Sequence, residues 1–109
     1  MKNTELLFTE SEVRKQSARS PKVSVVLLNL NGYEDTRDCL ESLRHVHYKN
    51  SEIIVVDNGS SDDSPLRLQR EFPEVRLLSS KENLGFTGGN NLGIEDALGR
   101  NADYVLLLN

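Results

Sequence analysis

The run Val-Ser-Val-Val-Leu-Leu-Asn-Leu-Asn-Gly at residues 23–32 constrains the fold more than any other part of the sequence. Its first six residues are apolar except for Ser24, and several are β-branched, which is typical of a strand buried on both faces of a parallel sheet. Polar side chains appear only where the run ends, at Asn29 and Asn31. Ligands of open parallel sheets bind at the carboxyl ends of the strands. We therefore interpret this run as the first and central strand of a parallel sheet.

The rest of the chain repeats this plan of a strand, a polar turn and a helix. The expected elements are a helix over 33–46, a strand over 52–57, a helix ending near Phe72, a strand over 75–79, a loop over 81–91, a helix over about 89–99 and a strand over 104–108. The Asn-Gly pair at 58–59 is also a hairpin signal, but a segment of helical period follows it. The alternation predicts the α/β class, with a doubly wound and mostly parallel sheet.

Composition limits the classes of function. The chain has 109 residues, a formal net charge of -4 and a pI of about 5.1. This charge argues against nucleic-acid binding, which needs clustered Lys and Arg, and leaves small anions possible at helix N-termini. No apolar run approaches the roughly 20 residues of a transmembrane segment. The single cysteine, Cys39, is expected to be a packed thiol in a reducing, cytosolic compartment.

Residues 1–20 differ from the rest of the chain. They are mixed and charged, with one short apolar cluster at Leu6, Leu7 and Phe8. We predict a flexible arm over 1–20 that docks, if at all, only through this cluster, followed by a single folded domain over 21–109.

Three polar clusters follow three of the expected strands. They are Asn29, Asn31 and Gly32; Asp57, Asn58 and Gly59 with Asp62 and Asp63; and the Gly- and Asn-rich stretch Asn83–Asn91. In a parallel sheet all three lie at one edge, and this convergence predicts a binding site there.

The individual residues leave alternatives open. Asp57 stands where doubly wound sheets bind a ribose or a base, and it could equally stabilise a turn. Asp62 and Asp63 fit the capping of a helix. The stretch 83–91 could hold a phosphate at a helix N-terminus, or its glycines could serve only tight turns and close packing. It matches neither the Walker motif nor the dinucleotide-binding motif.

The three motifs VSVVLLNLNG, IIVVDNGSSD and ENLGFTGGNNLG together resemble the family 2 glycosyltransferases, and the rhamnosyltransferase-like branch in particular. The resemblance covers about residues 21–109. It implies a Rossmann-like GT-A fold whose first half binds a nucleotide-diphospho-sugar, here a UDP- or dTDP-sugar, for transfer to a glycan or cell-surface polysaccharide. The donor-binding residues that it implies are Asn29, Leu30, Asn31, Asp57, Asn58, Asn83, Gly85, Gly88, Gly89 and Asn90.

The resemblance also implies parts that are not in this sequence. The family's Asp-x-Asp-type motif, which binds Mg²⁺ or Mn²⁺, follows the fourth strand and is expected beyond Asn109, as are the acceptor site and the catalytic base. We therefore assign no catalytic residue and no metal ligand here, and we expect the chain to be inactive alone. The alternative is a non-catalytic nucleotide-binding or interaction module. A receiver-like signalling domain is disfavoured, because Asn31 and Gly32 stand where it needs acids.

The last strand carries a further expectation. Tyr104–Leu108 should lie beside the first strand with its other side open, and such an edge is a template for pairing with another chain. We predict a homodimer through this edge. The alternative is a monomer in which Leu6, Leu7 and Phe8 of the arm cover the edge. The expected location is the cytoplasm, and a peripheral place at the membrane stays open for a full-length enzyme.

Overall fold

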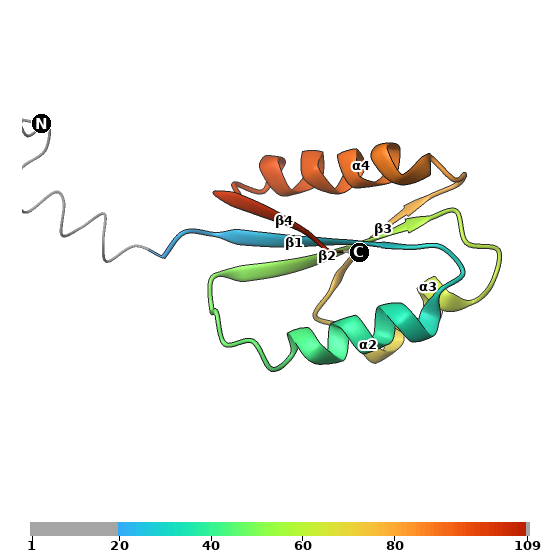
Figure 1. Ribbon diagram of the computed structural model, residues 1–109, viewed down its shortest axis with the longest axis horizontal. Helices are drawn as coiled ribbons and strands as arrows, with labels where there is room; N and C mark the ends of the chain where they lie inside the picture. Colours follow the sequence, from blue (N-terminus) through green and yellow to red (C-terminus); the bar gives the residue numbers. More distant parts are fainter. Residues whose placement is uncertain (1–19, 109) are drawn as a thin grey trace, which may run out of the picture.

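The computed structural model describes residues 20–108 and has the predicted α/β fold (Figure 1). A parallel sheet of four strands has the order β3-β2-β1-β4. Its strands are β1 (Val23–Asn29), β2 (Ser51–Asn58), β3 (Arg76–Ser80) and β4 (Tyr104–Leu108). The helices α2 (Tyr33–Leu43) and α3 (Ser64–Glu71) cover one face, and α4 (Gly85–Gly99) covers the other. The predicted arm over 1–20 lies outside the described residues, except for Ser20.

The core has two layers because the central strands are buried on both faces. Val25 and Val26 are neighbours in β1, so their side chains point to opposite faces, and both are buried. The layer against α2 and α3 contains Val25, Leu27, Leu40, Val55, Leu68, Phe72 and Val75. The layer against α4 contains Val26, Ile54, Val56 and Ala97. This double burial explains the unbroken apolar run that predicted the central strand.

Two predicted boundaries are wrong. The first helix was expected to reach Val46, but α2 ends at Leu43, and the N–H of Val46 closes a short turn on the Leu43 carbonyl at 3.0 Å. The stretch 81–91 was expected to be a loop, but α4 already begins at Gly85. The strands β2, β3 and β4 match the predicted ones to within one residue.

Close packing of α4 on the sheet explains why the glycine-rich first turns of this helix were mistaken for a loop. A Cβ atom on Gly93 would lie 2.4 Å from Cγ1 of Val26, and one on Gly89 would lie 2.9 Å from Cδ2 of Leu28. Such approaches are far inside van der Waals contact, so these positions need glycine. The packing contact therefore overrides the low intrinsic helix propensity of glycine.

Candidate active site

The carboxyl ends of β1 and β2 meet at Asn29 and Asp57, which are paired in register. The Asn29 side chain is 1% exposed, and its amide nitrogen donates to Oδ1 of Asp57 at 2.9 Å and to Oγ of Ser64 at 2.8 Å. Its amide oxygen accepts from Oγ1 of Thr36 at 2.7 Å. One buried amide therefore joins the end of β1 to β2, α2 and α3. A network in which every member is satisfied fixes the positions of the surrounding loops.

Asp57 turns toward the protein, and it is 3% exposed. Besides the Asn29 contact, its Oδ1 accepts from Oγ of Ser60 at 2.6 Å, and its Oδ2 accepts from the Ser60 N–H at 3.0 Å. The role in a turn is thus observed. An ionised carboxylate offers about four acceptor positions, and the protein donors from Asn29 and Ser60 occupy three of them. Within residues 20–108, one position on Oδ2 has no donor.

Asn31 links the loop after β1 to the loop after β2. It adopts a left-handed backbone conformation with φ of 50°. Its side-chain oxygen accepts from the backbone N–H groups of Ser61 at 2.8 Å and Asp62 at 3.1 Å. Its own N–H donates to Oγ of Ser60 at 2.9 Å. Leu30, which precedes it, is 44% exposed and adds an apolar surface to this polar edge.

The predicted capping role falls to one of the two acids before α3. Oδ1 of Asp62 accepts from the Ser64 N–H at 2.9 Å, and hydrogen bonds from Ser64 lower the pKa of the Asp62 carboxyl. Asp63 occupies the position immediately before the helix but makes no side-chain capping bond.

Asn58 holds the start of α4 against the end of β2. Its side-chain oxygen accepts from the Leu84 N–H at 2.9 Å, and its amide nitrogen donates to the Gly85 carbonyl at 3.0 Å. The exposed Asn83 accepts from the Gly85 N–H at 2.8 Å, and Gly85 has a φ of 78°, which favours glycine. Asn58 and Asn83 thus shape the turn that starts α4.

The remaining predicted site residues lie in the first turns of α4. Gly88 is half-buried, and Gly89 packs against the Asn58 and Leu28 side chains. Asn90 is only 4% exposed, and neither polar atom of its side chain has a hydrogen-bond partner within residues 20–108. Buried polar groups are nearly always paired. Asn90 is therefore a polar side chain of this edge with free hydrogen-bonding capacity.

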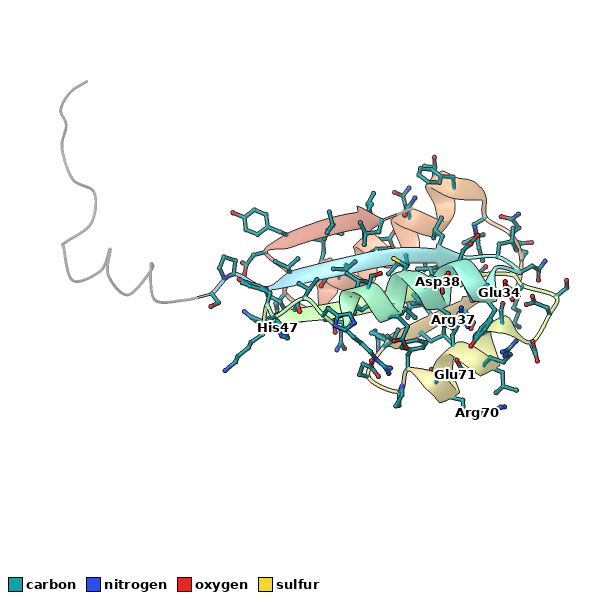
Figure 2. The ribbon with its side chains drawn as sticks, turned by 60° about the horizontal axis from the view of Figure 1, so that its bottom comes forward. Glu34, Arg37, Asp38, His47, Arg70 and Glu71 are labelled. Carbon is teal, nitrogen blue, oxygen red and sulfur yellow. The ribbon has the colours of Figure 1, made fainter. Side chains whose placement is uncertain are left out.

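A hollow of about 360 Å³ opens beside the network, between the starts of α2 and α3. Its lining consists of Asn31, Gly32, Tyr33, Glu34, Asp35, Asp62 and Arg67. The Arg67 guanidinium lies 3.6 Å from the centre of the Tyr33 ring, and the Tyr33 hydroxyl donates to Glu71, a bond that raises the pKa of Tyr33. Figure 2 shows Glu34 on α2 and Glu71 on α3 at this side of the fold.

Sequence reasoning missed three hydroxyl groups that complete the network, those of Thr36, Ser60 and Ser64. The signal that could have found Ser60 is its spacing of three residues from Asp57, which suits a turn closed by a carboxylate. Thr36 and Ser64 read only as helix residues, because their partner lies on β1.

The described residues do not form a metal site. Within residues 20–108, no group of three or more His, Cys, Asp or Glu side chains is placed to hold a metal ion. No helix in the same part of the chain is long and apolar enough to cross a membrane.

Comparison with known proteins identifies the family. The model of glycosyl transferase family 2 matches residues 24–109, which is most of the chain. The chain belongs to this family. The site at the ends of β1 and β2 is therefore a site in a family 2 glycosyltransferase sequence.

Relatives in family 2 include a low-salt glycan biosynthesis hexosyltransferase of Haloferax volcanii, 31% identical over 101 residues that make up 92% of this chain and 31% of that protein. A putative glycosyltransferase of Bacillus subtilis, EpsH, is 36% identical over 92 residues, or 79% of this chain and 26% of that protein. This chain thus spans about a quarter to a third of the length of these relatives.

A solved structure shares the fold. It is a mannosyltransferase from Pyrobaculum calidifontis in complex with GDP-Man and Mn²⁺, which superposes with a TM-score of 0.65 at 23% identity. The match covers 73% of this chain and 25% of that one. The predicted GT-A, Rossmann-like fold is confirmed.

Proposed function

We propose that residues 21–109 form the donor-binding part of a glycosyltransferase that transfers a hexosyl or rhamnosyl unit from a nucleotide-diphospho-sugar to a glycan acceptor. The observation that carries this proposal is the joining of the β1 and β2 loops through Asn29 and Asp57 at the carboxyl edge of the sheet. Ligands of doubly wound sheets bind at this edge. The structural neighbour was solved with a nucleotide-sugar, GDP-Man.

The groups at this edge suit a pyrimidine nucleotide. Uracil and thymine each carry one ring N–H donor, which the remaining acceptor position on Oδ2 of Asp57 would receive. The exposed Leu30 offers an apolar surface for the base, and Asn31 fixes the loop that borders it. The free amide of Asn90 can both donate and accept, as a ribose or sugar hydroxyl requires. We therefore favour a UDP- or dTDP-sugar.

The described residues do not supply a metal site, so no step of the reaction is assigned to a metal here. The neighbouring mannosyltransferase was solved with Mn²⁺, and a bound divalent ion stabilises the charge of a diphosphate leaving group. This chain's own residues account for binding and orientation of a nucleotide. We accordingly propose that the chain binds nucleotides weakly and transfers no sugar by itself. We propose the cytoplasm as its location. A non-catalytic nucleotide-binding module is the second candidate.

Titration calorimetry with UDP, dTDP and GDP, with and without Mg²⁺, tests the proposal. We expect weak binding of UDP or dTDP that falls about fivefold in Asn31→Ala, because one hydrogen-bonded loop contact contributes about 1 kcal/mol. Asn101→Ala is the matched control, since Asn101 is also exposed with positive φ but lies at the far end of α4. Equal losses in both variants, or no nucleotide binding at all, would refute the donor site. Sugar transfer by the pure chain would refute its inactivity.

The partner that we propose for β4 is a second copy of the chain. β4 is the outer strand beside β1, and Tyr104, Leu106 and Leu107 are 64%, 48% and 38% exposed. An apolar strand at a sheet edge favours pairing with another edge. Light scattering over a concentration series should show a dimer that Leu107→Lys weakens. A monomer at all concentrations would exclude it.

A further inference from the structure

A second hollow lies at the opposite edge of the sheet from the candidate active site. Its volume is about 260 Å³, and its lining of mostly apolar residues consists of Val23, Val25, Leu43, Val46, Tyr48, Ser51, Ile53 and Leu106. We call it the apolar groove. It lies on the α2 face, beside the starts of β1 and β2. Val46 and Leu106 are 62% and 48% exposed, so apolar side chains of the groove face the outside.

The described part of the chain begins beside this groove. The hydroxyl of Tyr48, a groove residue, donates to the Pro21 carbonyl. The side-chain amide of Asn50 donates to the Ser20 carbonyl at 2.7 Å. These two bonds fix the point from which residues 1–19 depart. Any segment of those residues is therefore tethered next to the groove, and tethering raises its effective concentration there.

The sequence of residues 1–19 contains one compact apolar cluster, Leu6, Leu7 and Phe8. Phe8 is twelve residues before Ser20, and twelve residues can span up to about 40 Å. That length exceeds the roughly 16 Å of α2, which borders the groove through Leu43. The tether is thus long enough for the cluster to reach every part of the groove.

One positive charge next to the groove can attract the acids beside the apolar cluster. The charged residues nearest the apolar cluster in sequence are mostly acids, Glu5, Glu10 and Glu12, whereas the basic residues lie farther from it, at Lys2, Arg14, Lys15 and Arg19. An adjoining hollow, which shares Val46 and Tyr48 with the groove, is also lined by His47 and the exposed Lys49. The positive charge of Lys49 beside an apolar floor favours an apolar segment whose nearest charged residues are carboxylates.

We propose that the segment Leu6–Phe8 docks into the apolar groove of its own chain. Docking removes apolar side chains of both the segment and the groove from water. It occupies the amino edge of the sheet and leaves the carboxyl edge, with Asn29 and Asp57, open. This interaction surface is independent of the proposed donor site.

A photo-cross-link from position 8 tests the proposal in the full chain. Phe8→p-benzoylphenylalanine is expected to cross-link to Val46, Tyr48 or Leu106, and mass spectrometry of an equal mixture of ordinary and ¹⁵N-labelled chains distinguishes contacts within a chain from contacts between chains. Cross-links within one chain to the groove support the docking. If about half of the cross-linked products join an ordinary chain to a labelled one, a second copy occupies the groove, which would overturn the proposal. Cross-links elsewhere or none would also overturn it.

Surface variants with matched exposure provide the control. Val46→Glu places a carboxylate in the groove and should abolish the cross-link. Leu66→Glu makes the same kind of change at an equally exposed site on α3, outside the groove, and should leave the cross-link intact; the two side chains are 62% and 61% exposed. Circular dichroism checks that both variants fold. A cross-link that survives Val46→Glu, or that both variants abolish alike, would contradict docking in the groove.

Discussion

The amide nitrogen of Asn29 is the point at which the site is most sensitive to the change of a single atom. Asn29→Asp keeps the shape of the side chain but replaces this donor by an oxygen 2.9 Å from Oδ1 of Asp57. The donor to Ser64 at 2.8 Å is lost as well. Both carboxyl groups would be almost fully buried, because Asn29 and Asp57 are 1% and 3% exposed.

The expected destabilisation is large. Leaving a buried charge without its partner costs about 3–5 kcal/mol, against a total stability of about 5–15 kcal/mol for a typical domain. The effect depends on pH, because two carboxylates in contact raise the pKa of one of them above its value in the unfolded chain. At pH values between the unfolded pKa and the raised folded pKa, the folded variant holds more protons than the unfolded variant. Its stability is therefore greatest at low pH and falls as the pH rises through the raised pKa.

Urea unfolding followed by far-ultraviolet circular dichroism, at several pH values between 5 and 8, measures both effects. The double variant Asn29→Asp/Asp57→Asn is the informative control, because it exchanges donor and acceptor and restores one amide–carboxylate pair. We expect it to recover most of the stability lost in Asn29→Asp and to lose the pH dependence. An Asn29→Asp variant within about 0.5 kcal/mol of the parent, the usual range for surface substitutions, would refute the buried network.

Three further predictions test other parts of the fold. In Gly93→Ala, overpacking against the sheet should cost about 1–3 kcal/mol, of which the higher helix propensity of alanine offsets roughly 1 kcal/mol. Gly99→Ala in the same helix is the control, because no atom lies within 4 Å of its new Cβ, and it should be neutral or stabilising in urea unfolding. Burial raises the pKa of the Cys39 thiol, so iodoacetamide should alkylate it more slowly at pH 7.5 in the folded chain than in urea, and equal rates would contradict this packing. Hydrogen bonding from Arg100 lowers the pKa of Glu52. The ion pair therefore stabilises the fold at pH values above the unfolded pKa of Glu52, and this contribution is lost as the pH falls through the folded pKa. Arg100→Ala should flatten the acid side of the stability–pH curve.

The sequence was sufficient for the parts of the fold that repeat a simple pattern. Because β1 is buried on both faces, at Val25 and Val26, its sequence is an unbroken apolar run that predicted a central strand. Its neighbours were predicted from the alternation of strands and helices. The start of α4 at Gly85 was not predicted, because glycines in its first turns, such as Gly89, are required by how close the helix lies to the sheet. A distance between two elements leaves no local signature in the sequence.

The candidate site was likewise predictable from the sequence only in part. Its location followed from the polar residues at the strand ends, and the register of Asn29 with Asp57 confirms their convergence. The direction of each side chain did not follow, because hydrogen-bond partners such as Ser64 come from elements 35 residues away. Pairing between such distant groups depends on the packed fold.

Asn29 and Asn58 perform the same physical task at two neighbouring strand ends. Asn29 uses both ends of its amide to join β1 to α2 and α3, and Asn58 uses both ends of its amide to join β2 to the start of α4. An amide that the protein already bonds at both ends has fewer positions left for a ligand than one without partners. In the donor site that we propose, direct recognition would therefore fall to groups with free capacity at the same edge, namely Oδ2 of Asp57 and the side chain of Asn90. The two amides hold the loops that position these groups, so substitutions at Asn29 and Asn58 should act on ligand binding through stability and loop geometry.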